Sequence, residues 1–470
     1  MAEPAYKDEV LQIEPKGIEH VVEGERHGRS TSVFTLWIGA NVEMATLVTG
    51  TLGVVVFGLS FWQAALAFVI GTALGAAMLG LLSTFGPRLG APQLVISRRA
   101  FGFFGNFAPG ILNIVAGIGW YAVNSVLGVF ALAYLLGVPY WLGTVIMVVL
   151  QGLVAVYGHN LIHSLERYLS IFLVVAFLIV SVYVVGHMNT ALAASATGPA
   201  LSGGFIATVG VAFAYMAGWM AFASDYTRYL PTSTPRLRVF GAAFLGNLVG
   251  AGWPGLLGVA LASMAPKLVG DGTSTLTGPI GMVASPSLLP HAIAILLLVA
   301  VAVGTLTANV LNIYSAALSS LVVNLPLKRW LAAVVIGLLG GLLTLLGRAN
   351  FASNLESFLF VLAYWIAPWA AIVALDQLLF APRADALGQR LYDPRRGLGL
   401  GLVAWVVGVL AAVPFFDQTF YTGPFARAHP GWGDVSYWVS MVVGSLVFLA
   451  LRRIVDRPRR AVATASAESA

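Results

Sequence analysis

The polar side chains that interrupt long apolar runs of the chain are the residues most able to bind a ligand or an ion. The first run contains Glu43, with Asn41 and Thr46 close by and glycines on both sides. A carboxylate in such a run handles a proton or a substrate, or it is a protonated structural group that hydrogen-bonds to a neighbouring helix. Glycine tolerates a helix break, and a broken helix exposes free N–H and C=O groups to a ligand. Both interpretations of Glu43 therefore stay open.

Two tryptophans and one amide form a second set of candidates. Trp120 and Asn124 are four residues apart, so their side chains lie on the same face of a helix. An indole stacks on a flat heteroaromatic ring, and an amide donates and accepts hydrogen bonds at the edge of that ring. Trp219 follows a glycine in a later run and offers a second indole. The competing interpretation is that these residues pack the core and link neighbouring helices.

Two more amides, Asn309 and Asn312, lie three residues apart within one apolar run. They share a helix face, and paired donors and acceptors of this kind match the edge of an adenine-like ring. Asp225 and Arg228 follow Trp219 at the end of its run, where a solvated gate or an anchor pair is the simpler interpretation. No histidine spacing indicates a metal site and no catalytic dyad is evident. We therefore expect no metal, no cofactor and no enzyme activity.

The composition decides what kind of molecule holds these residues. The chain has 470 residues, of which 59% are hydrophobic and 9% are charged. An average soluble domain carries about 25% charged residues, so a soluble enzyme and a nucleic-acid-binding module are excluded. We expect an integral membrane protein that contacts lipid over most of its surface, with no nucleic-acid partner and no protein partner implied.

Twelve apolar runs are long enough to cross a membrane as helices, since a span needs about 20 residues. These runs are continuously apolar, whereas the strands of a membrane barrel alternate, so we predict an all-α protein. The expected spans are 32–57, 62–84, 104–136, 142–158, 166–187, 204–226, 238–265, 290–325, 329–346, 352–379, 397–416 and 436–452.

The basic residues indicate how these spans are oriented. With twelve spans, 22 of the 25 lysines and arginines fall on the side of the two tails, and three fall on the other side. The positive-inside rule then predicts a multi-pass protein of the plasma (inner) membrane with both termini in the cytoplasm. The expected divisions are a cytoplasmic tail at 1–31, a ten-helix core at 32–379, a cytoplasmic loop at 380–396, two C-terminal membrane helices at 397–455 and a cytoplasmic tail at 456–470.

Several motifs, taken together, are specific. They are Phe34, Trp37 and Asn41 in the first span, residues 57–62, 97–105 and 158–167 in loops, and Trp120 with Asn124, 309–315 and 363–365 in later spans. They resemble the nucleobase–cation symporter-1 family, specifically its purine–cytosine permease branch, over nearly the whole chain. This resemblance implies a leucine-transporter-like core of two inverted five-helix repeats followed by two extra helices. The first and sixth helices would be broken at the substrate site.

The resemblance also implies which residues bind the substrate. The tryptophans would sandwich a base, the asparagines would bind its edge, and a first-helix threonine would lie close to it. The corresponding positions in this chain are Trp120, Asn124, Trp219, Asn309, Asn312 and Thr46.

One departure from the family bears on the coupling ion. Sodium-coupled members have two neighbouring hydroxyl residues on the eighth helix, where this chain has Leu306 and Thr307. One sodium ligand is therefore missing, while Glu43 supplies a titratable group next to the site. We expect proton coupling through Glu43, with sodium, and Thr307 as its ligand, as the alternative.

The predicted function is secondary active import of a flat, neutral heterocycle by alternating access, with cytosine or a purine as the first candidate. The same fold importing allantoin, a hydantoin, thiamine or a pyridoxine-like vitamin is the alternative. A membrane-embedded enzyme or a passive channel is least favoured, because polarity is concentrated at mid-depth in the spans.

Overall fold

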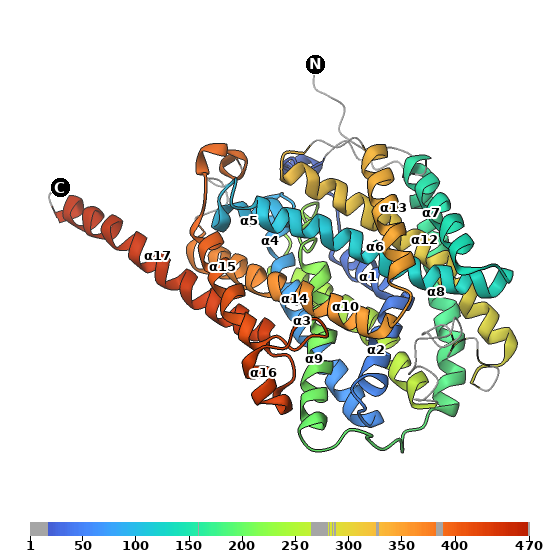
Figure 1. The fold of residues 1–470 in the computed structure, drawn as a ribbon. Helices are drawn as coiled ribbons and strands as arrows, with labels where there is room; N and C mark the ends of the chain where they lie inside the picture. Colours follow the sequence, from blue (N-terminus) through green and yellow to red (C-terminus); the bar gives the residue numbers. More distant parts are fainter. Residues whose placement is uncertain are drawn as a thin grey trace.

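The chain forms a bundle of helices that follow the expected spans, as the computed structural model in Figure 1 shows. The structure describes residues 17–157, 159–264, 281, 283, 285, 288–325, 329–381 and 389–468. The long helices within these residues are α1 (Ser30–Asn41), α2 (Met44–Val55), α3 (Phe61–Ser83), α6 (Phe107–Leu136), α7 (Tyr140–Tyr157), α8 (His159–His187), α9 (Pro199–Met220), α10 (Arg236–Met264), α12 (His291–Val322), α13 (Arg329–Leu346), α14 (Phe351–Leu375), α15 (Leu400–Ala412) and α17 (Ser436–Glu468).

Twelve helical segments correspond to the twelve expected spans. Six are long and apolar enough to cross a membrane, and α1 with α2 forms a seventh candidate that is bent by 62°. Five shorter apolar helices complete the set within the described residues. The prediction of an all-α, multi-pass membrane protein is therefore confirmed, and most helix ends differ from the expected ones by a few residues.

Two segments between or beyond the spans differ from what the sequence suggested. The helix α5 (Gln93–Phe101) forms where only a loop was expected before the third span. The last helix, α17, continues to Glu468, although its span was expected to end at residue 452 and a tail to begin at 456. Figure 1 shows this helix running outward from the bundle beside α15.

Local sequence explains where several helices begin and end. The helix α3 starts with a capping box, in which the Ser60 hydroxyl accepts from the Gln63 backbone N–H and the Gln63 side chain accepts from the Ser60 N–H. The helix α6 ends at Gly137, whose φ of 66° suits glycine better than any other residue. Such caps satisfy backbone groups that lipid leaves without a partner.

One group of helices packs around α10, which contacts α1, α2 and α3. Glycines make this packing close: a Cβ atom on Gly50 would lie 1.9 Å from the carbonyl oxygen of Gly255, and one on Gly258 would lie 1.9 Å from that of Leu47. Gly246 and Gly250 approach the backbone of α1 in the same way. Small residues that let backbones touch are the usual means of helix association in lipid.

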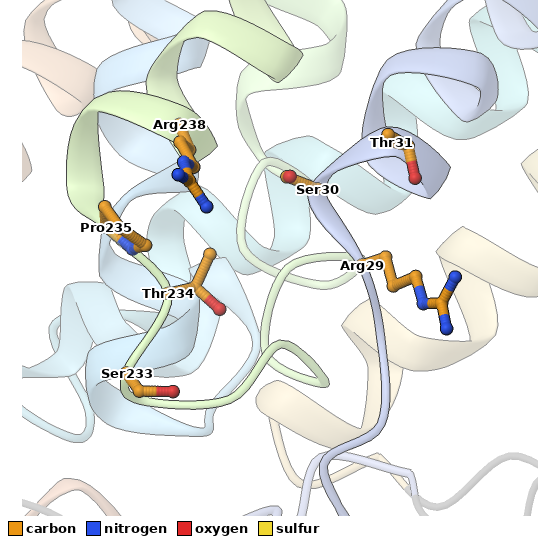
Figure 2. Close-up of a pocket in the computed structure, with 7 residues that line it drawn as sticks. All are labelled: Arg29, Ser30, Thr31, Ser233, Thr234, Pro235 and Arg238. Atoms are coloured by element: carbon orange, nitrogen blue, oxygen red, sulfur yellow. The ribbon is translucent and has the colours of Figure 1, made fainter.

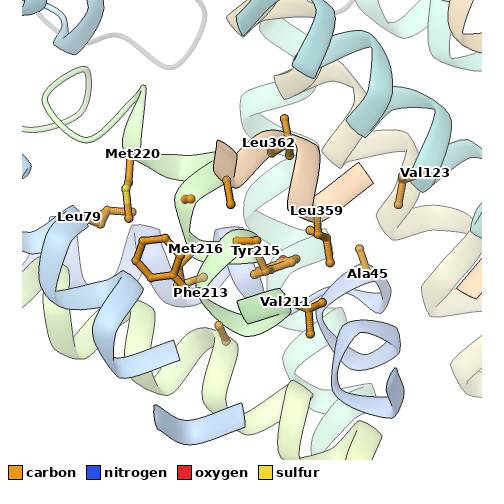
Figure 3. Close-up of a cluster of buried hydrophobic side chains, with 14 of the residues drawn as sticks. Ala45, Leu79, Val123, Val211, Phe213, Tyr215, Met216, Met220, Leu359 and Leu362 are labelled. Carbon is orange, nitrogen blue, oxygen red and sulfur yellow. The ribbon is translucent and has the colours of Figure 1, made fainter. Parts of the chain in front are cut away.

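A second group packs around α6, which contacts α12, α13 and α7. The helix α14 contacts both groups and also α15 and α17. Figure 3 shows the core where the groups meet, with Tyr215 of α9 near Ala45 of α2 and Leu359 of α14. The two groups enclose the region that holds the polar candidates.

A buried cluster of ion pairs lies at the C-terminal end of α14. Asp376, which is 1% exposed, pairs with Arg99 of α5 (Nε–Oδ2 2.8 Å) and with Arg452 of α17 (Nη2–Oδ1 3.1 Å). Two arginines compensate the cost of burying one carboxylate. The cluster joins α14 to a short interspan helix and to the last span.

Candidate functional site

The break in the first span puts Glu43 between two half-helices. The helix α1 ends at Asn41, α2 begins at Met44, and Glu43 is the extended residue that precedes α2. The buried Asn41 amide donates to the Trp37 carbonyl (2.7 Å) and to the Asn247 side chain on α10 (3.0 Å). The glycine-flanked run thus breaks at the residues that the sequence singled out.

Tyr215 of α9 connects the two sides of this break. Its hydroxyl lies 2.8 Å from Glu43 Oε1 and 2.5 Å from Thr46 Oγ1. The Thr46 hydroxyl also donates to the Asn41 carbonyl at 2.6 Å. Sequence reasoning missed Tyr215, although it lies four residues before Trp219 and so on the same helix face, which was the available signal.

A small cavity lies beside Glu43 between the two helix groups. Its volume is about 10 Å³, close to the smallest that holds one water molecule. The side chains of Glu43, Asn124 and Thr305 are its polar lining, and α8 and α12 contribute its apolar lining. A flat heterocycle needs more room, so the helices must separate for such a molecule to enter.

The two predicted tryptophans do not stack on each other. The Trp120 ring lies 5.5 Å from the Tyr215 ring at 89° and 5.2 Å from Phe358 at 83°, both edge to face. The Trp219 ring contacts Trp37 at 5.8 Å. The regular helix of the sixth span ends at Met220, one residue after Trp219, and the chain continues in turns over 221–229.

The three asparagines differ in how much hydrogen-bonding capacity they have left. The Asn309 amide nitrogen donates to the Tyr121 carbonyl (3.1 Å) and to Ser125 Oγ (2.8 Å), so this side chain ties α12 to α6. Asn312 donates to Asn309 Oδ1 (3.1 Å) and keeps its own carbonyl oxygen and one N–H. The buried Asn124 amide has no hydrogen-bond partner among the described residues and faces the cavity. Asn124 and Asn312 are therefore the amides that have donor and acceptor groups available for a ligand.

Three further residues that the sequence singled out have different surroundings in the structure. The side chain of Thr307 lies outside the described residues. Asp225 accepts from the Gln93 backbone N–H at the start of α5 (2.7 Å). The buried Arg228 donates to the Gly17 carbonyl (3.0 Å) and to the Tyr229 hydroxyl (2.9 Å). Both residues thus anchor neighbouring segments.

A larger hollow of about 460 Å³ lies at the surface where α1 and α10 begin, as Figure 2 shows. It is open, and none of the predicted site residues lines it. Its lining side chains are Arg29, Ser30, Thr31, Ser233, Thr234, Pro235 and Arg238. The enclosed region around Glu43 remains the candidate site.

A broken span beside a small cavity with a few polar groups, at the junction of two helix groups, is typical of secondary transporters. Residues 20–440 match the family described as permease for cytosine/purines, uracil, thiamine, allantoin. The chain belongs to this family of permeases, and it is a transporter and not an enzyme.

Relatives of known name cover almost all of the chain. It is 27% identical to the putative purine-cytosine permease YxlA of Bacillus subtilis, over 94% of this chain and 96% of that protein. It is 28% identical to the purine-cytosine permease fcyB of Emericella nidulans, over 94% and 89%. It is 27% identical to the vitamin B6 transporter TPN1 of Saccharomyces cerevisiae, over 94% and 87%.

Solved structures establish the fold. Mhp1, a nucleobase-cation-symport-1 family transporter in a closed conformation with bromovinylhydantoin bound, aligns with a TM-score of 0.71 at 18% identity, covering 96% of this chain and 97% of Mhp1. Its inward-facing conformation aligns at 0.74 and 17%, covering 96% of each chain. The expected leucine-transporter-like core with two additional helices is confirmed.

Proposed function

We propose that this protein imports a nucleobase such as cytosine or a purine across the plasma membrane by alternating access, with a proton as the coupling ion. The observation that carries the proposal is the cavity at the helix break, which one carboxylate and one uncommitted amide face together. An amide with free donor and acceptor groups suits the edge of a heterocycle. The named purine–cytosine permeases among the relatives support the same substrate class.

The roles of the site residues follow from their surroundings. Trp120 and Trp219 supply ring faces, while Asn124 and Asn312 bind the edge of the base. Asn309 holds Asn312 in place. We expect Thr46 to lie close to the substrate, with its hydroxyl already hydrogen-bonded to the Asn41 carbonyl and to Tyr215.

Glu43 is the proposed proton carrier. It lies at the break, it faces the cavity, and it contacts a hydroxyl donor. A transmembrane potential adds about 2.3 kcal/mol per charge per 100 mV to uptake driven by a cation. In this arrangement both termini are cytoplasmic, 32–379 forms the transport core, 397–455 adds two helices, and 1–31, 380–396 and 456–470 are cytoplasmic segments.

Uptake by purified protein in liposomes tests the proposal. Radiolabelled cytosine and adenine should accumulate under an inwardly directed proton gradient without sodium. Trp120→Ala and Asn124→Ala should each lower the uptake rate by about tenfold or more, since each removes a buried contact worth roughly 1–2 kcal/mol. The exposed Trp141→Ala and Asn354→Ala are matched controls that should transport normally. Uptake that needs sodium and ignores pH would contradict proton coupling.

A thermal-shift screen tests the substrate class separately. A ligand at about 100 times its Kd stabilises the folded protein by roughly 2.7 kcal/mol. Cytosine or a purine should give the largest shift in a panel that includes uracil, allantoin, hydantoin, thiamine and pyridoxine. A shift only with pyridoxine would replace the nucleobase by a vitamin, as in the relative named vitamin B6 transporter.

A further inference from the structure

Four oxygen atoms form a continuous chain across the break in the first span. Glu43 Oε1 lies 2.8 Å from Tyr215 Oη, which lies 2.5 Å from Thr46 Oγ1, which lies 2.6 Å from the Asn41 carbonyl oxygen. The chain begins at the residue before α2, passes through α9 and α2, and ends on the last residue of α1. All three contacts are short enough to be hydrogen bonds.

The number of hydrogens available to this chain depends on Glu43. Each hydroxyl supplies one hydrogen, the carbonyl supplies none, and the carboxyl supplies one only when it is protonated. If Glu43 is ionised, Tyr215 and Thr46 offer two hydrogens for three contacts. If Glu43 is protonated, it donates to Tyr215, Tyr215 donates to Thr46, and Thr46 donates to the Asn41 carbonyl. The observed geometry therefore satisfies every contact only in the protonated form.

Ionisation of Glu43 has a defined structural cost. Tyr215 must then donate to the carboxylate, so the single hydrogen of Thr46 serves either Tyr215 or the Asn41 carbonyl. The contact that loses its hydrogen leaves two oxygen atoms facing each other, and it must lengthen. One of these contacts joins α2 to α9 and the other joins α2 to the end of α1.

The described groups around Glu43 are uncharged, so the hydrogen-bond pattern of this chain of oxygens depends on whether Glu43 carries a proton. Tyr215 is the titratable group that faces it from α9. The other groups around the cavity are neutral: Asn124 of α6, Leu173 and Phe177 of α8, and Ala300, Val301, Gly304 and Thr305 of α12. Among the described residues, no charged side chain from these helices faces the carboxyl group.

We propose that Tyr215 and Thr46 are positioning residues through which the protonation state of Glu43 controls the attachment of α2 to α9 and to the end of α1. Tyr215 also contacts the Trp120 ring. A shift of its hydroxyl on proton loss therefore reaches one of the two proposed substrate-binding indoles. The proposal rests on the proposed function for its role in transport, whereas the hydrogen-bond chain itself is testable without any substrate.

The test is infrared difference spectroscopy of the purified protein in lipid, titrated with acid and base. A protonated buried carboxyl group has a C=O stretching band, and Glu43→Gln should remove that band. Tyr215→Phe should change its frequency, because the carboxyl loses its hydrogen-bond partner. Thr46→Val should shift it in the same direction by less, and Thr46→Ser, which restores a hydroxyl, should return it to the wild-type position.

Tyr437→Phe is the matched control. Tyr437 is also fully buried, its hydroxyl has no hydrogen-bond partner among the described residues, and it lies on α17. This variant should leave the band unchanged. A Glu43 band that Tyr215→Phe and Thr46→Val do not move, or no band that Glu43→Gln removes, overturns the proposal.

The liposome assay separates this proposal from the proposed function. If wild-type protein takes up no nucleobase but its band responds as described, the substrate assignment fails and the proton-dependent chain stands. If uptake follows the proton gradient but the band is the same in wild type and Tyr215→Phe, the transporter assignment stands. The proposed hydrogen-bond chain through Tyr215 is then refuted.

Discussion

Two carboxylates inside the bundle, the partly buried Glu43 and the buried Asp376, lie in very different surroundings. Asp376 at the end of α14 has two arginines within 3.1 Å, from α5 and α17. Glu43 at the break of the first span has a tyrosine hydroxyl and a small cavity whose other lining residues are uncharged. Both carboxylates connect helices that are far apart in the sequence.

The difference distinguishes the structural acid Asp376 from the proposed proton carrier Glu43. An acid with two cationic partners is held in place by them, and its protonation would leave the arginines uncompensated in a buried place. An acid with only neutral partners accepts a proton without losing such a contact. Its two ion pairs therefore give Asp376 a structural role in linking helices. Among the described residues Glu43 has no cationic partner, so it can change its charge without breaking an ion pair.

The largest effect on the free energy of unfolding is expected when the ion pairs of Asp376 are removed. Asp376→Asn leaves Arg99 and Arg452 without their carboxylate and should lower the free energy of unfolding by about 3–5 kcal/mol. Chemical unfolding of the purified protein in detergent measures this loss. Arg453→Gln, at the exposed neighbour of Arg452, should change it by less than about 1 kcal/mol. An equally small loss in Asp376→Asn would show that the pairs do not fasten α14.

An intermediate effect is expected from Tyr215→Phe. The substitution keeps the ring and removes the hydroxyl that serves both Glu43 and Thr46. Leaving buried polar groups unsatisfied costs roughly 1–3 kcal/mol, which the same unfolding experiment detects. Tyr437→Phe should cost clearly less, since no partner loses a bond. Equal losses of unfolding free energy in the two variants would show that the Tyr215 hydroxyl contributes no more than an unpaired one.

The smallest effect on stability is expected from Glu43→Gln. An amide can donate to Tyr215 as a protonated carboxyl does, so the unfolding free energy should change by less than about 1 kcal/mol. Proton-driven accumulation in liposomes should nevertheless be lost, because no proton can leave the site. A loss of stability as large as that of Asp376→Asn would mean that Glu43 is a charged structural group.

Much of this architecture is predictable from the sequence because lipid imposes simple rules on it. Each span must be long, apolar and hydrogen-bonded within itself, so twelve apolar runs became twelve helical segments. The glycines around Glu43 predicted the break, and of the predicted pair Trp120 and Asn124, Asn124 lines the cavity.

The partners of these residues were not predictable in the same way. Tyr215 lies in a run of small and apolar residues, and nothing local indicates that its hydroxyl meets Glu43, 172 positions earlier. The pairing of Asp376 with Arg99 likewise depends on α5, a short helix that the sequence suggested only as a loop. Such contacts are set by how the helices pack, which local propensity does not encode.

The glycines of α10 bear on the mechanics of the first span. Gly250 touches α1, Gly255 and Gly258 meet α2, and Pro254 stands between them in a helix where it removes one backbone hydrogen bond. The seventh span, α10, therefore packs against both half-helices of the first span, on either side of its break. A change in the 62° bend at that break would alter these contacts, and Pro254 is the point at which α10 is most easily bent with it.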